Sequence, residues 1–305
     1  MRTARREEVL ALAAALLTVT LWASAFVGIR SAGRDLSPGA LSLFRLVVGA
    51  LVLGAVTVVR REPLPRRRDL PAIVFCGVLW FGIYNVVLNE AERRVDAGTA
   101  AMLVNIGPIF IAILAGVFLR EGFPRALVAG CAIAFAGAVV IGLATSEHGV
   151  HASWGAALCL VAALAYSSAV VAQKPLLKRV SALQITFLAC TVGAIACLPF
   201  APTLAGDLKD ARPSAIAWAV YLGVLPTAVA FTTWAYALAR TTAGRMGSTT
   251  YLVPPLAILM AWAILGESPP ALAFAGGALC LMGVVVARGQ LRRLRRPAPA
   301  AAPAA

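Results

Sequence analysis

The sequence predicts an all-α integral membrane protein of ten transmembrane helices, built as two inverted five-helix repeats. Three observations predict this fold: the composition, ten apolar stretches of spanning length, and an internal repeat. Of the 305 residues, 61% are hydrophobic and only 13% are charged, whereas soluble domains carry about 25% charged residues. A soluble globule could not cover so much apolar surface with its few polar residues, so the chain is expected to be solvated by lipid.

Ten stretches are long enough to cross a bilayer, which takes about 20 mostly apolar residues. Short segments with Pro or Gly connect them, and the longest connection is the polar stretch 204–213. The first stretch imitates a signal peptide, but it has a counterpart later in the chain and is expected to remain in the fold. The stretches are 9–29, 38–59, 70–90, 97–119, 125–144, 153–173, 182–203, 214–238, 244–265 and 270–288.

The distribution of positive charge predicts the orientation. Of the 27 Lys and Arg residues, 20 fall on the side that holds the N-terminus, six fall on the other side, and Arg45 lies within a stretch. This bias is the positive-inside rule. Both termini are therefore expected in the cytoplasm and the chain in the inner (plasma) membrane. The net charge of +14 is a topology signal, and no nucleic-acid partner is expected.

The two halves repeat each other in sequence. A shift of 146 residues places Pro108 on Pro254 and Glu121 on Glu267, and it also superposes several glycines, Gly77 on Gly223 among them. Five helices per unit is an odd number, so the second copy is expected to enter the bilayer upside down. The predicted organisation is a cytoplasmic N-terminus (1–8), a first repeat (9–144), a second repeat (153–288) and a basic, then Ala/Pro-rich cytoplasmic tail (289–305).

Prolines interrupt two of the predicted spans near mid-membrane. Pro108 lies in 97–119, and the tandem Pro254-Pro255 lies in 244–265. A proline removes a backbone hydrogen bond, and freed carbonyls in a bilayer are tolerated where they are buried in protein or line a cavity. These three prolines are the predicted hinge residues, and a packing kink without functional contact is the alternative.

Polar and aromatic residues at similar depth predict a substrate site. Asn and other polar side chains inside a bilayer usually face the bundle interior or water, although they also form bonds between helices. Flat rings suit an apolar or aromatic moiety, and amide and hydroxyl groups suit a polar end. The candidates are Trp22, Ser24, Tyr84, Asn85, Asn105, Tyr166, Trp234, Thr250 and Tyr251.

Few ionisable groups lie inside the predicted spans. Arg45, about two turns into 38–59, is expected to reach an interface or pair with another helix; contact with an anionic group is the alternative. Glu90, Glu121 and Glu267 lie near helix ends, which favours capping and loop anchoring over proton relay. No proton-coupling residue is therefore identified.

Other chemistry is not indicated. The sequence contains no HExxH, P-loop or GxSxG motif, and its six cysteines and two histidines form no metal-ligand pattern. The chain is thus not expected to be an enzyme or to hold a metal or cofactor. Small residues recur every fourth position over 126–142, which favours close packing within the chain, with a homodimer contact as the alternative.

Several of these segments resemble one family. The stretches in question are 21–26, Phe44-Arg45, Pro108 to Glu121 and Pro254 to Glu267. Over residues 9–288 the chain is similar to the EamA-type transporters of the drug/metabolite transporter superfamily. The resemblance implies an exporter of amino acids, metabolites or drugs, with a central cavity lined mainly by the first, third, fourth, sixth, eighth and ninth helices. The tandem Pro254-Pro255 departs from the single proline that the family usually has.

The sequence thus favours a secondary transporter that exports a small amphipathic molecule by alternating access. A flippase or exchanger for a phosphate-bearing lipid or nucleotide sugar is the alternative, and an intramembrane enzyme or receptor is less favoured because no acid, base and nucleophile converge at one depth. The expected partners are a small-molecule substrate and membrane lipid. The substrate, the direction of transport, the coupling ion and the oligomeric state are not predicted.

Overall fold

The computed structural model describes residues 2–94, 104–145, 154–265 and 271–289. Within these ranges every regular element is a helix, so the all-helical class is confirmed. Six helices are long and apolar enough to cross a membrane, or seven if one bent pair counts as a single span. The total of ten helices stays a prediction.

The six long helical segments include three that are continuous. These are α1 (Arg2–Ala32), α2 (Pro38–Val59) and α8 (Trp154–Leu176). The other three are composite. The first consists of α3 (Leu70–Cys76), η2 (Gly77–Ile83) and α4 (Tyr84–Ala91). The second consists of α11 (Pro213–Leu222), η4 (Gly223–Val229) and α12 (Ala230–Arg240), and the third of α13 (Ala243–Ser248), η5 (Thr249–Leu252) and α14 (Val253–Leu265). Shorter apolar segments come from α6 (Gly107–Phe118), α7 (Arg125–Thr145) and α15 (Ala271–Gly289).

Some predicted features lie outside the described residues. They are the beginning of the stretch 97–119, the loop with His148 and His151, the end residue Glu267, and the tail from 290 onward.

The predicted connection 204–213 is mostly helical, which corrects the sequence analysis. α9 (Ala182–Ala196) is followed by η3 (Leu198–Phe200) and α10 (Ala201–Asp210), with a bend of 50° between the two parts. Pro199 and Pro202 each stand in the first turn of a new helix, where the missing N–H costs nothing. The Asp207 carboxylate of α10 accepts a hydrogen bond of 2.7 Å from the backbone N–H of Ser37, just before α2. The segment is therefore a helix docked on the end of α2.

Two composite helices contain a π-helical segment at matching positions. η2 begins at Gly77 and η4 begins at Gly223, the two glycines that the repeat superposes. A Cβ on Gly223 would lie 2.8 Å from the carbonyl oxygen of Arg45, and one on Gly77 would lie 2.7 Å from that of Ala189. Each π segment thus packs tightly on a helix from the other half of the chain. Single π turns within α-helices frequently mark functional sites, which directs attention to the region between η2 and η4.

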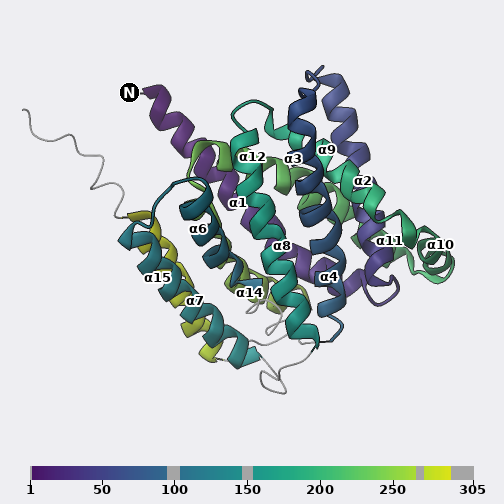
Figure 1. The fold of residues 1–305 in the computed structure, drawn as a ribbon. Coiled ribbons are helices and arrows are strands. Elements are labelled where there is room, and N and C mark those ends of the chain that lie inside the picture. The colour runs from purple at the N-terminus through teal and green to yellow at the C-terminus, as the bar shows by residue number, and fades with distance from the viewer. Residues whose placement is uncertain (1, 95–103, 146–153, 266–270, 290–305) are drawn as a thin grey trace, which may run out of the picture.

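α7 and α15 form a closely packed pair at one side of the molecule (Figure 1). A Cβ on Gly130 would lie 2.5 Å from the backbone nitrogen of Ala287, and one on Gly283 would lie 2.4 Å from that of Ala134. The stripe of small residues therefore serves packing within the chain, as expected. A homodimer stays a prediction.

Replacing Gly130 by Leu should lower the thermal stability of the protein. The new side chain has no space against α15, and overpacking of this kind typically costs about 1–3 kcal/mol. The six cysteines are all buried, so a thiol-reactive dye can report unfolding of the detergent-purified protein. Val128→Leu, at an exposed position of the same helix, is the control and should unfold like the wild type. Equal unfolding temperatures for the two variants would contradict the packing described here.

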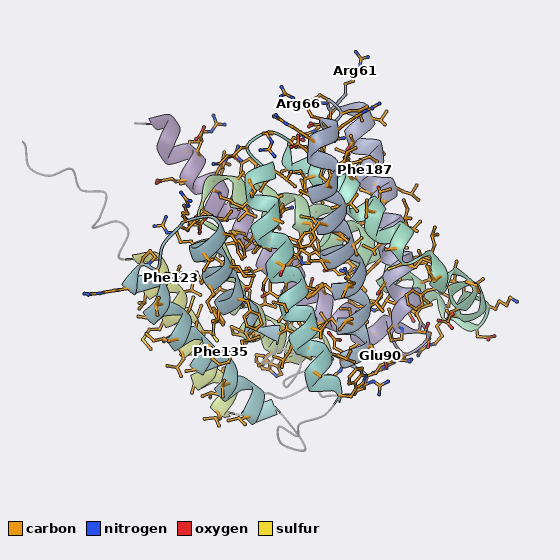
Figure 2. The ribbon with its side chains drawn as sticks, in the orientation of Figure 1. Arg61, Arg66, Glu90, Phe123, Phe135 and Phe187 are labelled. Carbon is orange, nitrogen blue, oxygen red and sulfur yellow. The ribbon has the colours of Figure 1, made fainter. Side chains whose placement is uncertain are left out.

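Contacts between loops agree with the predicted sidedness. Arg61 and Arg66 project from one end of the molecule and Glu90 lies toward the opposite end (Figure 2). Loops expected in the cytoplasm meet in three pairs: Ser181 with Glu62, Arg179 with Asp69, and the Ala243 N–H with Glu121. Loops expected on the other side meet where Arg212 pairs with Asp35. Glu121 thus anchors a loop, as expected, and the orientation itself stays a prediction.

Candidate functional site

A cavity lies between the two halves of the chain. It encloses about 720 Å³ of atom-free space, including its open mouth, and its walls come from α1, α2, η2, α4, α8, α12, η5, the first residue of α14 and the residues just before α6. Most of the lining is apolar, with a small number of polar groups. This combination is typical of sites that bind small molecules.

Six of the nine predicted binding residues line this cavity. They are Trp22, Tyr84, Asn85, Asn105, Tyr166 and Thr250.

The other three candidates lie elsewhere. Ser24 is not part of the cavity lining, and its hydroxyl lies 2.6 Å from that of Tyr221. Trp234 is fully buried behind Trp22, with 4.9 Å between the ring centroids. Tyr251 is also fully buried and packs in the cluster that α7 and α15 form. These three residues support the cavity's walls or the neighbouring helix pair instead of lining the cavity.

An aromatic wall that the sequence analysis only partly predicted forms one side of the cavity. Trp22 of α1 packs against Trp80 of η2 at 6.0 Å and against Phe231 of α12 at 5.3 Å between ring centroids. Trp80 and Phe231 themselves pack edge to face at 4.9 Å. Neither Trp80 nor Phe231 was a sequence candidate. The position of Trp80 four residues before Tyr84, on the same helical face, is the signal that could have identified it.

Asn85 has a structural task as well as a place in the cavity lining. Its side-chain amide donates to the carbonyl oxygens of Trp80, at 3.1 Å, and Phe81, at 2.9 Å. Both carbonyls belong to the π segment η2, whose altered hydrogen bonding leaves backbone groups in need of partners. The donor of Asn85 is therefore engaged within its own helix, and only its acceptor oxygen remains for a ligand.

The predicted hinge prolines stand at the beginnings of helices. Residues 105 and 106 form a turn before α6, and Pro108 lies in the first turn of that helix. In the second half, the 3-10 segment η5 precedes α14, whose first residues include Pro254 and Pro255. A helix thus begins beside the cavity in each half of the chain, and Asn105 and Thr250 line the cavity just before these two helices. Whether the prolines act as hinges stays a prediction.

α8 is held against the beginning of α6. The Ser167 hydroxyl donates a hydrogen bond of 3.0 Å to the carbonyl oxygen of Gly107. A Cβ on Gly107 would lie only 1.9 Å from the hydroxyl oxygen of Tyr166. The close approach of the Tyr166 ring therefore depends on glycine at position 107.

Arg45 is a buried part of the cavity lining. Its side chain is 4% exposed, and its Nε–H donates a hydrogen bond of 3.1 Å to the hydroxyl oxygen of Thr227 in η4. The expectation that Arg45 extends to a membrane interface is therefore wrong, because the guanidinium turns inward to the π segment of the other half. Its pairing with another helix was also expected and is confirmed.

A second, more polar cavity adjoins the first. The two share Phe26 and Ile29 in their linings, and Glu92 and Arg30 line the second one. Burial raises the pKa of the Glu92 carboxyl from 4.5 to about 8, while the positive charges of Arg30 and Arg45 act in the opposite direction. One carboxylate oxygen of Glu92 is buried without a hydrogen-bond partner within the described part of the chain. At neutral pH this carboxyl is therefore mostly protonated.

The raised pKa of Glu92 predicts a pH-dependent stability. The folded protein binds this proton more tightly than the unfolded chain does. The contribution of the Glu92 carboxyl to the free energy of unfolding is therefore fully present below pH about 4.5 and is lost as the pH rises through about 8. The side chain of the Glu92→Gln variant cannot lose a proton. Between about pH 6 and 9, the unfolding temperature of this variant should therefore change less with pH than that of the wild type. Thermal unfolding with the thiol-reactive dye, over a pH series and after correction for the dye's own pH response, measures this. Parallel curves for the two proteins would contradict the assignment.

The chain matches known proteins over nearly its whole length. The model of the EamA-like transporter family matches twice, at residues 9–143 and 153–289. A protein of Streptantibioticus cattleyicolor named a probable terminal-alkyne amino-acid exporter is 40% identical over 287 residues, covering 93% of this chain and 95% of the relative. The uncharacterized transporter YdfC of Bacillus subtilis is 34% identical over 268 residues, covering 88% and 87%.

The fold is also similar to a solved one. A crystal structure superposes with a TM-score of 0.76 at 21% sequence identity, covering 93% of this chain and 98% of the other. At this identity the likeness concerns the fold alone.

Proposed function

Because this chain belongs to the EamA-like transporter family, we propose that it is a secondary transporter that exports a small amphipathic molecule by alternating access. That it is a multi-pass membrane protein and a transporter rather than an enzyme follows from the family and the apolar helices. The substrate, the direction and the mechanism are the proposed parts. An amino acid with an apolar side chain is the proposed substrate, which extends to this chain what the Streptantibioticus relative's name says of that protein.

The observation that carries the proposal is the cavity shared by the two halves. Its aromatic wall joins Trp22 and Trp80 of the first half to Phe231 of the second. Movement of one half against the other would therefore open or close the same site toward either side of the membrane. The double match of the family model supports the two repeats of the proposal.

The two helix beginnings beside the cavity supply the moving parts of the proposed mechanism. The first lies at Asn105 and Pro108 and the second at Thr250 and Pro254, so both repeats carry one. Broken helices that meet at the centre of the membrane are a recurrent design of secondary transporters. In this proposal the termini lie in the cytoplasm, and the site accepts substrate there and releases it outside.

A phosphate-bearing lipid or nucleotide sugar fits the cavity less well. Arg45 is the one basic residue among the described residues that line it. A phosphodiester or diphosphate of such a substrate would require more positive charge and more donors to replace its hydration.

Counterflow into proteoliposomes tests the proposed function. Purified protein is reconstituted with unlabelled L-propargylglycine, L-norleucine or L-phenylalanine inside, and uptake of the same labelled amino acid is measured from outside. At least one of the three should be taken up faster than into protein-free liposomes, and a nucleotide sugar should not be. Absence of uptake for all three amino acids would contradict the proposal, and uptake of the nucleotide sugar alone would favour the alternative. Adding a pH gradient to the same assay reveals coupling to protons.

A further inference from the structure

Arg45 places a positive charge inside a largely apolar cavity. The side chain is 4% exposed and lines the cavity between the two halves. Burial of a cation is unfavourable unless a counter-ion or several hydrogen bonds compensate it. Within the described parts of the chain, no carboxylate lies at ion-pair distance from this guanidinium, and its hydrogen-bond acceptor, the Thr227 hydroxyl, carries no charge. The charge of Arg45 is thus only weakly compensated by the protein.

Glu92 does not neutralise this charge at physiological pH. Its carboxyl group interacts electrostatically with Arg45, and it lines the adjoining cavity. Burial raises the pKa of Glu92 to about 8, so the neutral acid predominates at pH 7. Arg45 therefore acts as a fixed cation in the cavity.

The second half of the chain holds the guanidinium in one orientation. Its Nε–H is occupied by Thr227, and Thr227 is positioned by the π segment η4, where its methyl group lies 2.9 Å from a Cβ built on Gly49. With Nε engaged, the two terminal nitrogens are left for the cavity that Arg45 lines. A guanidinium presents these donors in a planar fork that matches the two oxygens of a carboxylate.

The rest of the lining limits the partner to one carboxylate with an apolar body. Apart from Arg45, the described lining residues carry no formal charge, and the aromatic wall of Trp22, Trp80 and Phe231 is apolar. From this arrangement we infer that Arg45 binds the carboxylate of the transported molecule and makes the cavity specific for monocarboxylates with an apolar tail. This inference rests on the proposed transport function and adds the group that selects the substrate.

Matched ligands isolate the carboxylate. L-Propargylglycine carries a carboxylate and an ammonium group, its primary amide keeps only the ammonium group, and 4-pentynoic acid keeps only the carboxylate. Their binding is measured by titration of tryptophan fluorescence on the full chain in lipid nanodiscs, since Trp22 and Trp80 line the cavity. The wild type should bind L-propargylglycine about ten- to a hundredfold more tightly than the amide, the range of a charge-assisted hydrogen bond, and should bind 4-pentynoic acid as well.

Variants of Arg45 separate recognition from structure. Arg45→Gln should bind L-propargylglycine and its amide with similar affinity, and Arg45→Lys should keep part of the preference because it keeps the charge. Thr227→Val, which removes only the anchor of the guanidinium, should reduce the preference without abolishing it. Thermal unfolding of each variant shows whether it is folded. If Arg45→Gln fails to fold, the acid-to-amide ratio of Arg45→Lys and Thr227→Val carries the test.

Four results would overturn the inference. The first is equal affinity of the wild type for L-propargylglycine and its amide. Counterflow of both compounds would then show that the proposed transport function holds without carboxylate recognition by Arg45. If Arg45→Gln keeps the full preference for the acid over the amide, another group is responsible for the selectivity. If Arg45→Gln does not fold, a full preference in both Arg45→Lys and Thr227→Val has the same meaning. Parallel weakening of acid and amide in Arg45→Gln would give Arg45 a purely structural role. If the wild type neither binds nor transports any amino acid tested, the proposed function fails together with the inference.

Discussion

Replacing Trp22 by Ala is expected to reduce the affinity for an apolar amino acid by at least about tenfold and to reduce counterflow accordingly. Trp22 contacts Trp80 and Phe231 in the cavity wall, and its indole N–H donates a hydrogen bond of 3.3 Å to the carbonyl oxygen of Pro226 in η4. The substitution removes a large apolar contact surface and also the link between α1 and the π segment of the second half. Aromatic side chains contribute through both burial and ring geometry.

The control for this prediction is the same substitution outside the cavity. Trp262 of α14 is 51% exposed and does not line the cavity, so Trp262→Ala should bind and transport like the wild type. Trp22→Phe should recover much of the ring contact but not the bond to Pro226, and should therefore lie between the two. Fluorescence titration and counterflow measure all three variants. A Trp22→Ala protein that is folded and binds as tightly as Trp262→Ala would remove Trp22 from the site.

Replacing Gly107 by Ala is expected to lower stability and abolish most transport. The added Cβ would lie 1.9 Å from the Tyr166 hydroxyl oxygen and 2.2 Å from its ring carbon Cζ. The Tyr166 ring is buried and lines the cavity, so it can yield mainly by moving into the space that the substrate occupies. Overpacking in a protein interior typically costs about 1–3 kcal/mol, and the displaced ring would also block the site.

A second variant tests whether the clash is the cause. Tyr166→Leu removes the ring, so the loss of stability caused by Gly107→Ala should be much smaller in that background, which is the behaviour of two residues in direct contact. Gly206→Ala, in α10 with no atom within 4 Å of the added Cβ, is the control and should not be destabilising. Dye-monitored unfolding gives the four stabilities of the cycle. Additive effects of the two substitutions would contradict the contact.

The sequence was sufficient for the helical class and for six of the fifteen residues that line the cavity. Spans of about 20 apolar residues and polar residues inside them are local signals, and they led to Trp22, Tyr84, Asn85, Asn105, Tyr166 and Thr250, which the cavity brings together. Depth alone does not tell which face of a helix a residue occupies. For that reason the same argument selected Trp234 and Tyr251, which are buried at other interfaces.

The remaining features depend on contacts between the halves. Arg45 turns inward because Thr227, 182 positions further along the chain, offers its hydroxyl oxygen, and no local pattern encodes that partner. The π segments begin at Gly77 and Gly223, whose coincidence in the repeat was visible but whose hydrogen bonding was not. α10 was predicted as a connection because its polar residues break the apolar pattern, although two prolines start the helices there.

The central claim is that one cavity, shared by the two halves, faces either side of the membrane in turn and holds the substrate. Leu88 lines this cavity and is 4% exposed, so Leu88→Cys in a background without the six native cysteines reports its accessibility. A membrane-impermeant thiol reagent is applied to right-side-out vesicles and, separately, to inverted vesicles, with and without L-propargylglycine. The account predicts labelling from both sides and protection by the amino acid in each case. Labelling from one side alone, unchanged by any amino acid that the protein transports, would contradict it.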